Sequence, residues 1–550
     1  MPTELRLWIE KSLFLLIIVL IGFPSLIAQP TPVREADARC GKCHAEIYRN
    51  YLTTPMANAS GVATEKLIPG SYTHLSSGLS YVVSQSGGQA MLTTLDQGHN
   101  SDALKRPLSF FLGSGHLATT YLYSINNFLF ESPVAWYAAS NKYDMKPGLA
   151  ELKRVPPGII MQSSCLRCHM SAVQQSDSGT LNHYKALAFL HSGITCEACH
   201  GEAEKHATEG KRRGIVNPAR LSAEQRDSIC ISCHLEGDVT VERAGYSALN
   251  YRPGESISKY LAFYVYGGAD PTARGVSEVE QFAKSTCKQA SGDKMSCNSC
   301  HDPHFTPDAQ QRTAFFRSKC VACHNQSQFL AGHHPENQDC TNCHMKRTGA
   351  ENIPHVAWTD HRILRIAQPV NPQAPADSTT DLAPIFSPGA TNRDLAMANY
   401  KALLENNQQP EPKAWAQLKH LQFEITDDKD ALDAWGVTSA KRGDTNAAER
   451  AFERVLELAP DDLTALSNLG TLKARRGDLK GAEALLKSAF DRNQDVSGLA
   501  IDLAHVQCMT GDATAARSTL EATSVYNPGL EDVRELLTQL SDCGGTNGKR

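Results

Sequence analysis

The sequence predicts a mainly α-helical protein in two parts: an irregular N-terminal domain with a small inserted antiparallel β-sheet, and a C-terminal α-solenoid. Two patterns carry this prediction. The pattern Cys-x-x-Cys-His occurs seven times before residue 345, and a period of 34 residues runs through the C-terminal part. At 550 residues the chain also exceeds the size at which a single core usually stops growing, so we expect at least two domains.

Residues 1–28 have the features of a signal peptide. Arg6 and Lys11 precede the apolar run 13–23, and Pro24 and small residues follow it. Eleven apolar residues are short for a spanning helix, which needs about 20. We therefore expect a periplasmic or otherwise extracytoplasmic protein. An uncleaved N-terminal anchor is the alternative, because residues 13–28 are nearly continuously apolar.

The seven motifs define the predicted N-terminal domain, residues 29–365, and they use fourteen of the seventeen cysteines. The cysteines are Cys40, Cys43, Cys165, Cys168, Cys196, Cys199, Cys230, Cys233, Cys297, Cys300, Cys320, Cys323, Cys340 and Cys343. The histidines that end the motifs are His44, His169, His200, His234, His301, His324 and His344.

This spacing is the attachment pattern for c-type haem. On one helical turn two sulfurs reach the vinyl groups of the porphyrin, and the adjacent imidazole becomes the proximal ligand of the iron. Structural zinc would pair the motifs in twos and would not require a histidine each time, and seven is odd. A redox dithiol normally occurs once, in a βαβ context. The sequence therefore predicts seven covalently attached haem c groups.

The long interval between the first two motifs predicts a β-rich insertion, residues 45–164. Stretches such as LSYVVSQ (79–85), AMLTTL (90–95) and ATTYLYSI (118–125) alternate apolar and polar residues and are rich in β-branched and aromatic residues. We expect a small antiparallel sheet there. The other motif regions predict short helices and loops, with haems packed closely.

Each iron needs a sixth ligand, and a second histidine would give a saturated iron suited to electron transfer. Eleven histidines of this domain lie outside the motifs, enough for all seven irons. The predicted distal ligands are His74, His116, His191, His206, His304, His355 and His361. Met56 and Met170 are alternatives, although methionine more often serves packing.

Residues 366–392 contain five prolines and predict an extended linker. After it, KRGD, RRGD and MTGD place Gly443, Gly477 and Gly511 at intervals of 34 residues, the length of a tetratricopeptide helix pair. Residues 393–540 therefore predict a tetratricopeptide repeat domain, with 393–423 as a degenerate capping pair. An ordinary helical domain is the alternative.

Solenoids of this kind bind polypeptides and carry no chemistry, so we expect redox partner proteins to dock there. A net charge of −5 gives no sign of a nucleic-acid partner.

The motifs CEACHGEAEKH, MSCNSCHDPH and IPHVAWTDHRI, with the trailing repeats, resemble multihaem cytochromes c of the c-552/c-554 type fused to tetratricopeptide repeats. The likeness covers nearly the whole chain after the leader. This wider group includes electron carriers as well as relatives of pentahaem nitrite reductase and octahaem hydroxylamine oxidoreductase, so the resemblance implies either electron transfer or catalysis.

In the nitrite-reductase relatives a lysine replaces the proximal histidine of the catalytic haem. Here Lys284-Ser-Thr-Cys287-Lys288 has the second cysteine and the lysine, but Lys284 stands at the position of the first cysteine. We therefore interpret Cys287 as a structural thiol, with a Lys-ligated haem as the alternative.

The predicted function is electron transfer by a heptahaem cytochrome with a docking domain and no catalytic residue of its own. One alternative is a multihaem oxidoreductase acting on small nitrogen or sulfur oxyanions, and another is a scaffold subunit of a membrane redox complex.

Overall fold

The computed structural model describes residues 29–96, 103–210, 214–267, 274–326, 333, 338–349, 353–365, 381–386, 389–405, 412–540 and 543. The predicted leader, 1–28, and most of the predicted linker lie outside these residues. No helix in the described part of the chain has the length and apolar character needed to cross a membrane.

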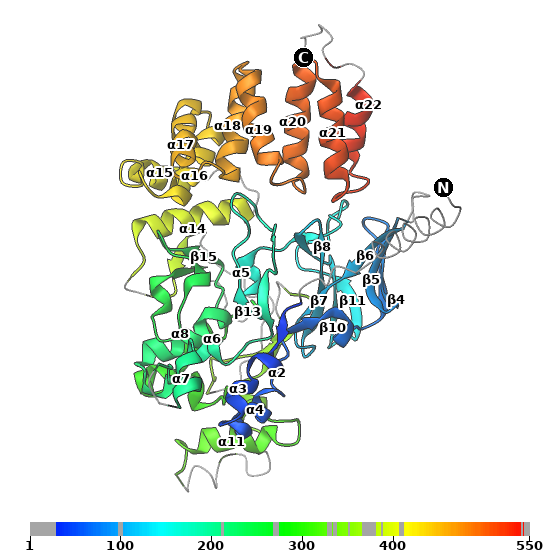
Figure 1. The fold of residues 1–550 in the computed structure, drawn as a ribbon. Coiled ribbons are helices and arrows are strands. Elements are labelled where there is room, and N and C mark those ends of the chain that lie inside the picture. The colour runs from blue at the N-terminus through cyan, green and yellow to red at the C-terminus, as the bar shows by residue number, and fades with distance from the viewer. Residues whose placement is uncertain are drawn as a thin grey trace, which may run out of the picture.

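Residues 60–160 form two antiparallel sheets, a larger β-region than the one small sheet predicted (Figure 1). One is a meander of β3 (Gly70–His74), β4 (Leu79–Ser86), β5 (Gln89–Asp96) and β6 (Leu104–Leu108). The other orders β11 (Lys142–Met145), β10 (Val134–Tyr137), β8 (Ala118–Ile125), β7 (Phe110–Leu112) and β2 (Ser60–Val62), with β9 (Phe128–Glu131) on β8 and β12 (Ile159–Ile160) on β9. The predicted alternation of apolar and polar residues is present in β4. Tyr81 and Val83 are buried, and Val83 pairs with buried Leu92.

Short helices and turns carry the Cys-x-x-Cys-His motifs. They include α2 (Val33–Ala36), α3 (Ala38–Gly41), α4 (Ala45–Tyr51), α5 (Ser163–Leu166), α6 (Glu197–His200), α7 (Glu204–Glu209), α8 (Ala223–His234), α9 (Glu278–Ala283), α10 (Thr286–Ser291), α11 (Arg312–Val321) and α13 (Thr341–His344). Three small sheets join them: β1 (Thr31–Pro32) with β14 (Phe189–Ser192) and β13 (Met170–Val173), β15 (Val239–Glu242) with β16 (Leu261–Tyr266) and β19 (Leu382–Pro384), and β17 (Arg347–Gly349) with β18 (Ala357–Thr359).

The C-terminal part is a solenoid of antiparallel helix pairs (Figure 1). Its helices are α14 (Asn392–Glu405), α15 (Pro412–Leu421), α16 (Lys429–Lys441), α17 (Thr445–Leu458), α18 (Leu463–Arg475), α19 (Leu479–Phe490), α20 (Ser497–Met509), α21 (Ala513–Ser524) and α22 (Glu531–Gln539). Gly436 and Gly470 lie where a Cβ would collide with Phe452 and Leu486, so small residues allow the two helices of a pair to approach closely.

Aspartate side chains begin five of these helices. The residues are Asp428, Asp444, Asp462, Asp478 and Asp512, and each accepts a hydrogen bond from the backbone N–H three residues later. An N-cap of this kind stabilises a helix by about 1 kcal/mol. In the three repeated turns the preceding glycine has a positive φ, 81° at Gly443, which glycine adopts without strain. The KRGD-type sequences are therefore helix-connecting turns.

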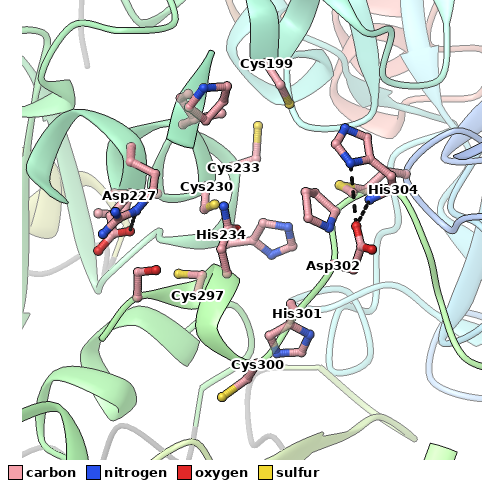
Figure 2. Close-up of a pocket in the computed structure, with 18 of the residues that line it drawn as sticks. Cys199, Asp227, Cys230, Cys233, His234, Cys297, Cys300, His301, Asp302 and His304 are labelled. Atoms are coloured by element: carbon pink, nitrogen blue, oxygen red, sulfur yellow. Dashed lines mark hydrogen bonds and ion pairs between the residues drawn. The ribbon is translucent and has the colours of Figure 1, made fainter. Parts of the chain in front are cut away.

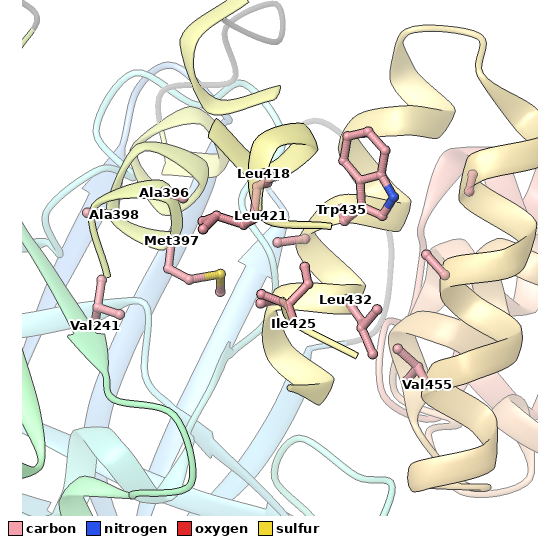
Figure 3. Close-up of a cluster of buried hydrophobic side chains, with 14 of the residues drawn as sticks. Val241, Ala396, Met397, Ala398, Leu418, Leu421, Ile425, Leu432, Trp435 and Val455 are labelled. Carbon is pink, nitrogen blue, oxygen red and sulfur yellow. The ribbon is translucent and has the colours of Figure 1, made fainter. Parts of the chain in front are cut away.

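The junction between the two parts differs from the extended linker predicted for residues 366–392. Leu382–Pro384 forms β19 on the edge of β16, and α14 packs on the same sheet. Figure 3 shows the shared core, in which Val241 of the sheet lies near Met397 of α14, with Ile425 and Trp435 of the solenoid beyond it. Helices thus dominate the solenoid, while sheets make up much of the N-terminal part, so that a mainly α class describes only the C-terminal part well.

A disulfide joins Cys508 of α20 to Cys543 after α22, across 35 residues, although neither cysteine was assigned a role from the sequence. Closing a loop of this length stabilises the folded state by about 3–4 kcal/mol in the chain-entropy model. We expect Cys508→Ser to lower the free energy of unfolding of the solenoid by about this amount, measured by urea unfolding. Reduction with dithiothreitol should have no further effect on the variant; if the variant and the oxidised parent unfold alike, the disulfide is not formed.

Asp433 makes solenoid stability depend on pH. Burial, and then the neighbouring Asp462 carboxylate, raise the pKa of Asp433 from 3.8 to about 8. Between pH 4 and pH 8 this carboxyl is ionised in the unfolded chain but still protonated in the folded one. The free energy of unfolding should therefore fall as the pH rises through this range. At pH 8.5 we expect Asp433→Asn to have a free energy of unfolding on the order of a few kcal/mol higher than the parent, measured by urea unfolding. Glu521→Gln, at an exposed carboxylate of α21 that does not act on Asp433, is the control and should leave the pH dependence unchanged.

Candidate haem-binding cavity

All seven motifs contribute residues to one cavity of about 3380 Å³. Ordinary ligand pockets measure about 300–1,000 Å³, so this space suits several large groups. Figure 2 shows part of it, where Cys230, Cys233, His234, Cys297 and His301 border a common open centre. The cavity lies among the short helices and turns of the N-terminal part.

One helical turn arranges most of the motifs for attachment. In five of them the backbone N–H of the histidine donates to the carbonyl of the first cysteine at 2.9–3.0 Å, as between His44 and Cys40. In the fourth motif the same turn lies within α8. All fourteen motif cysteines are free thiols. Both sulfurs of a motif can therefore bond to one porphyrin while the imidazole binds its iron. This is the set of groups that haem c requires.

Four motif histidines face a second imidazole with nearly parallel ring planes. The ring-centre distances are 6.3 Å for His44 and His206, 5.9 Å for His200 and His304, 6.2 Å for His301 and His361, and 5.8 Å for His344 and His333. Two imidazoles that bind one metal ion from opposite sides place their ring centres about 6 Å apart, given metal–nitrogen distances of about 2.0 Å and roughly 1 Å from each nitrogen to its ring centre. The residues present therefore fit iron with two axial histidines.

The structure thus brings predicted residues His206, His304 and His361 to motif histidines. His333, which is not among the predicted distal ligands, joins them opposite His344. Its only sequence signal is its place between the last two motifs.

The remaining predicted distal ligands lie elsewhere, and two of them need correction. Both ring nitrogens of buried His74 are hydrogen-bonded, Nδ1 to Ser77 and Nε2 to the carbonyl of Ala150, so none is left for iron. His355 Nε2 lies 2.7 Å from an oxygen of Asp144, outside the cavity. His116 is exposed and His191 is half-buried, and neither lines the cavity. Met56 and Met170 do line it.

Burial keeps one of the facing pairs in the state that binds metal. Burial, and then the nearby His361, lower the pKa of His301 to about 4. A neutral imidazole has a free lone pair, whereas an imidazolium has none. His301 is therefore ready to bind iron across the neutral pH range.

Motifs that are far apart in sequence lie next to one another. Cys40 hydrogen-bonds Cys196, and the Asp37 carboxylate lies within 4.8 Å of both sulfurs. Asp37 also accepts a hydrogen bond of 2.9 Å from the backbone N–H of Cys196. The sulfur pairs Cys168 and Cys233, Cys230 and Cys297, and Cys320 and Cys340 are likewise in contact. These contacts group the first motif with the third, the second with the fourth and fifth, and the sixth with the seventh.

Lys288 is not placed as an iron ligand. Its Nζ donates to the carbonyls of Met295 at 2.8 Å and Gly292 at 3.1 Å. Cys287 is a free, half-buried thiol on the cavity wall. The arrangement favours the structural interpretation of this stretch.

Comparison with known proteins agrees with this geometry. Residues 137–201 match the family Cytochrome c554 and c-prime, and residues 439–497 and 473–540 match the Tetratricopeptide repeat family. The multihaem cytochrome MtrA of Shewanella baltica strain OS185 is 26% identical over 180 residues, 29% of this chain and 52% of the relative. The chain joins a multihaem c-type cytochrome to tetratricopeptide repeats.

This multihaem cytochrome spans about half the length of that relative. Two solved structures match parts of it: an O-GlcNAc transferase mutant of Thermobaculum terrenum (27% identity, TM-score 0.19, 20% of this chain and 22% of that chain) and MamA of Desulfovibrio magneticus RS-1 (15% identity, TM-score 0.23, 29% and 99%). The family and relative matches support haem c binding, and the repeats support protein interaction.

Proposed function

We propose that the protein is an extracytoplasmic electron carrier with seven haem c groups, mainly bound by two histidines each, and that its solenoid docks a redox partner. The four facing imidazole pairs carry this proposal. An iron saturated by protein ligands suits electron transfer rather than substrate binding.

Haem c supplies one-electron chemistry between ferric and ferrous iron. The fourteen motif cysteines form the thioether bonds, and each motif histidine is the proximal ligand. His206, His304, His361 and His333 serve as distal ligands and connect segments far apart in the sequence. The chain thereby holds the imidazoles at fixed separations.

The disulfide between Cys508 and Cys543 supports the proposed location. Disulfides persist in oxidising compartments and are rare in the reducing cytosol. Haem attachment and the predicted signal peptide favour the same side of the membrane.

The inner helices of the solenoid offer polar groups to a partner polypeptide. Asp502 of α20 hydrogen-bonds Thr471 of α18, and Arg475 and His505 lie nearby. Such a surface favours hydrogen bonding to an extended segment over burial of an apolar helix. A partner that presents an extended, polar polypeptide segment would fit these helices.

Catalysis on small nitrogen or sulfur oxyanions is the second candidate function. One observation favours it: within the described ranges, neither His169 nor His234 belongs to a facing imidazole pair. An iron with an open position could bind such a substrate.

Carbon monoxide binding to the dithionite-reduced protein tests the proposal. Saturated irons do not bind carbon monoxide, so an electron carrier should keep its Soret spectrum while a potentiometric titration cycles every haem. A stoichiometric carbon monoxide complex at one or two haems would instead favour the catalytic function.

A further inference from the structure

The second motif, Cys165 to His169, lies close to the solenoid. The segment that follows it, residues 174–188, connects β13 to β14 and reaches the loops between successive helix pairs. Asn493 Nδ2 donates to the carbonyl of Gly179 at 2.7 Å. Gly179 has φ +73°, and a Cβ there would collide with the main-chain oxygen of Asp461. This turn is therefore fitted closely between two loops of the solenoid.

The same segment is packed firmly against the second motif. Ser163, at the start of α5, donates to the carbonyl of Gln174 at 2.8 Å and lies 3.0 Å from the hydroxyl of Tyr184. Leu166 of the motif and Tyr184 of the segment are buried in one hydrophobic cluster. The motif, the segment and the edge of the solenoid therefore form one packed unit, and Figure 1 draws α5 directly below the solenoid.

The second motif also lies at the margin of the haem-binding cavity. Cys168 lines the cavity and contacts Cys233 of the fourth motif, which connects it to the other motifs. Cys165 and His169 do not line the cavity, and Cys165 is exposed. One side of this motif thus faces the remaining motifs, and the other faces outward.

We propose that the solenoid-bound partner exchanges electrons with the protein at the haem attached to Cys165 and Cys168. One electron moves from the partner's reduced centre to this ferric haem, the partner is oxidised by one electron, and no bond forms or breaks. This inference rests on the proposed function and names the point of entry. The competing entry point is α11 with the sixth motif, at the opposite end of the molecule from the solenoid (Figure 1).

Photochemical electron injection tests the point of entry. In a Cys287→Ser background, a ruthenium photosensitiser is attached to Arg492→Cys, beside Gly179, or to Lys480→Cys. Both positions are exposed. Lys480 lies in the first turn of α19, a helix about 18 Å long, and Arg492 lies two residues beyond its other end. A third label at exposed Ser318→Cys of α11 reports on the other end of the molecule.

We expect the label at position 492 to reduce the haems at least about tenfold faster than the label at 480, equivalent to about 1.4 kcal/mol in the barrier. Removing the second attachment site, with Cys165→Ala and Cys168→Ala, should slow injection from 492 at least about tenfold and leave injection from 318 unchanged. Equal rates from 492 and 480 in the full-length protein would overturn the inference even if the double variant fails to fold. Failure of all three labels to reduce any haem would contradict the proposed function itself.

Discussion

A chain exported without haem attachment is expected to lose the cooperative fold of the segments that carry the Cys-x-x-Cys-His motifs. The cavity of about 3380 Å³ would lack the porphyrins that fill it, and an apolar space of that size cannot stay open. Helices α3, α5, α6 and α13 have four residues each, too few for stability on their own, and α11 has no buried residue. These elements depend on the porphyrins for their packing.

Limited proteolysis of protein made with and without a cytochrome c maturation system measures this effect. Without haem, cleavage should spread through the motif region at least about a hundredfold faster, the equivalent of losing about 2.7 kcal/mol of local stability. Helices α16 to α21 should resist, because they have their own caps and core. Identical digestion patterns for the two preparations would contradict the expectation.

Substitution of a distal histidine should change the spin state of one haem only. His304→Ala removes the imidazole that faces His200 at 5.9 Å, so the iron held by His200 would have a single protein ligand. We expect one new high-spin ferric signal in the electron paramagnetic resonance spectrum, with a matching loss of one low-spin haem.

His74→Gln is the matched control for this substitution. Both ring nitrogens of His74 are occupied by Ser77 and Ala150, so its loss should leave all spin states unchanged. A high-spin signal from His74→Gln, or an unchanged spectrum from His304→Ala, would show that the ligand pairs are assigned wrongly.

The solenoid was predictable because its contacts are local. Gly436 contacts Phe452 of the next helix, and the pattern repeats at Gly470 and Leu486 with a 34-residue period. A short-range pattern of this kind can be read directly from the sequence. The β-region shows the opposite case, since the alternation identified strands but gave no information on how many would join each sheet.

The positions of the distal histidines in the sequence follow the same rule. His206 and His304 lie three to six residues after motif histidines, so the sequence places them near haem sites. His333 was missed because no periodic pattern surrounds it. His74 and His355 were assigned wrongly because their actual partners, Ala150 and Asp144, are distant in sequence.

The linker shows how packing overrides composition. Prolines favour an extended chain, and Leu382–Pro384 is extended, yet it pairs with β16 as an edge strand. Proline is tolerated at such an edge because its missing N–H can face away from the ladder. The solenoid is therefore packed against the cytochrome domain, which no composition signal indicated.

The number of attached haems decides whether the protein is a heptahaem cytochrome. An intact-mass spectrum of the mature protein, combined with a pyridine haemochrome assay, counts the attached groups. We expect seven haems per chain, with Cys287 unmodified. Fewer than seven, or an eighth attached at Cys287, would contradict this expectation.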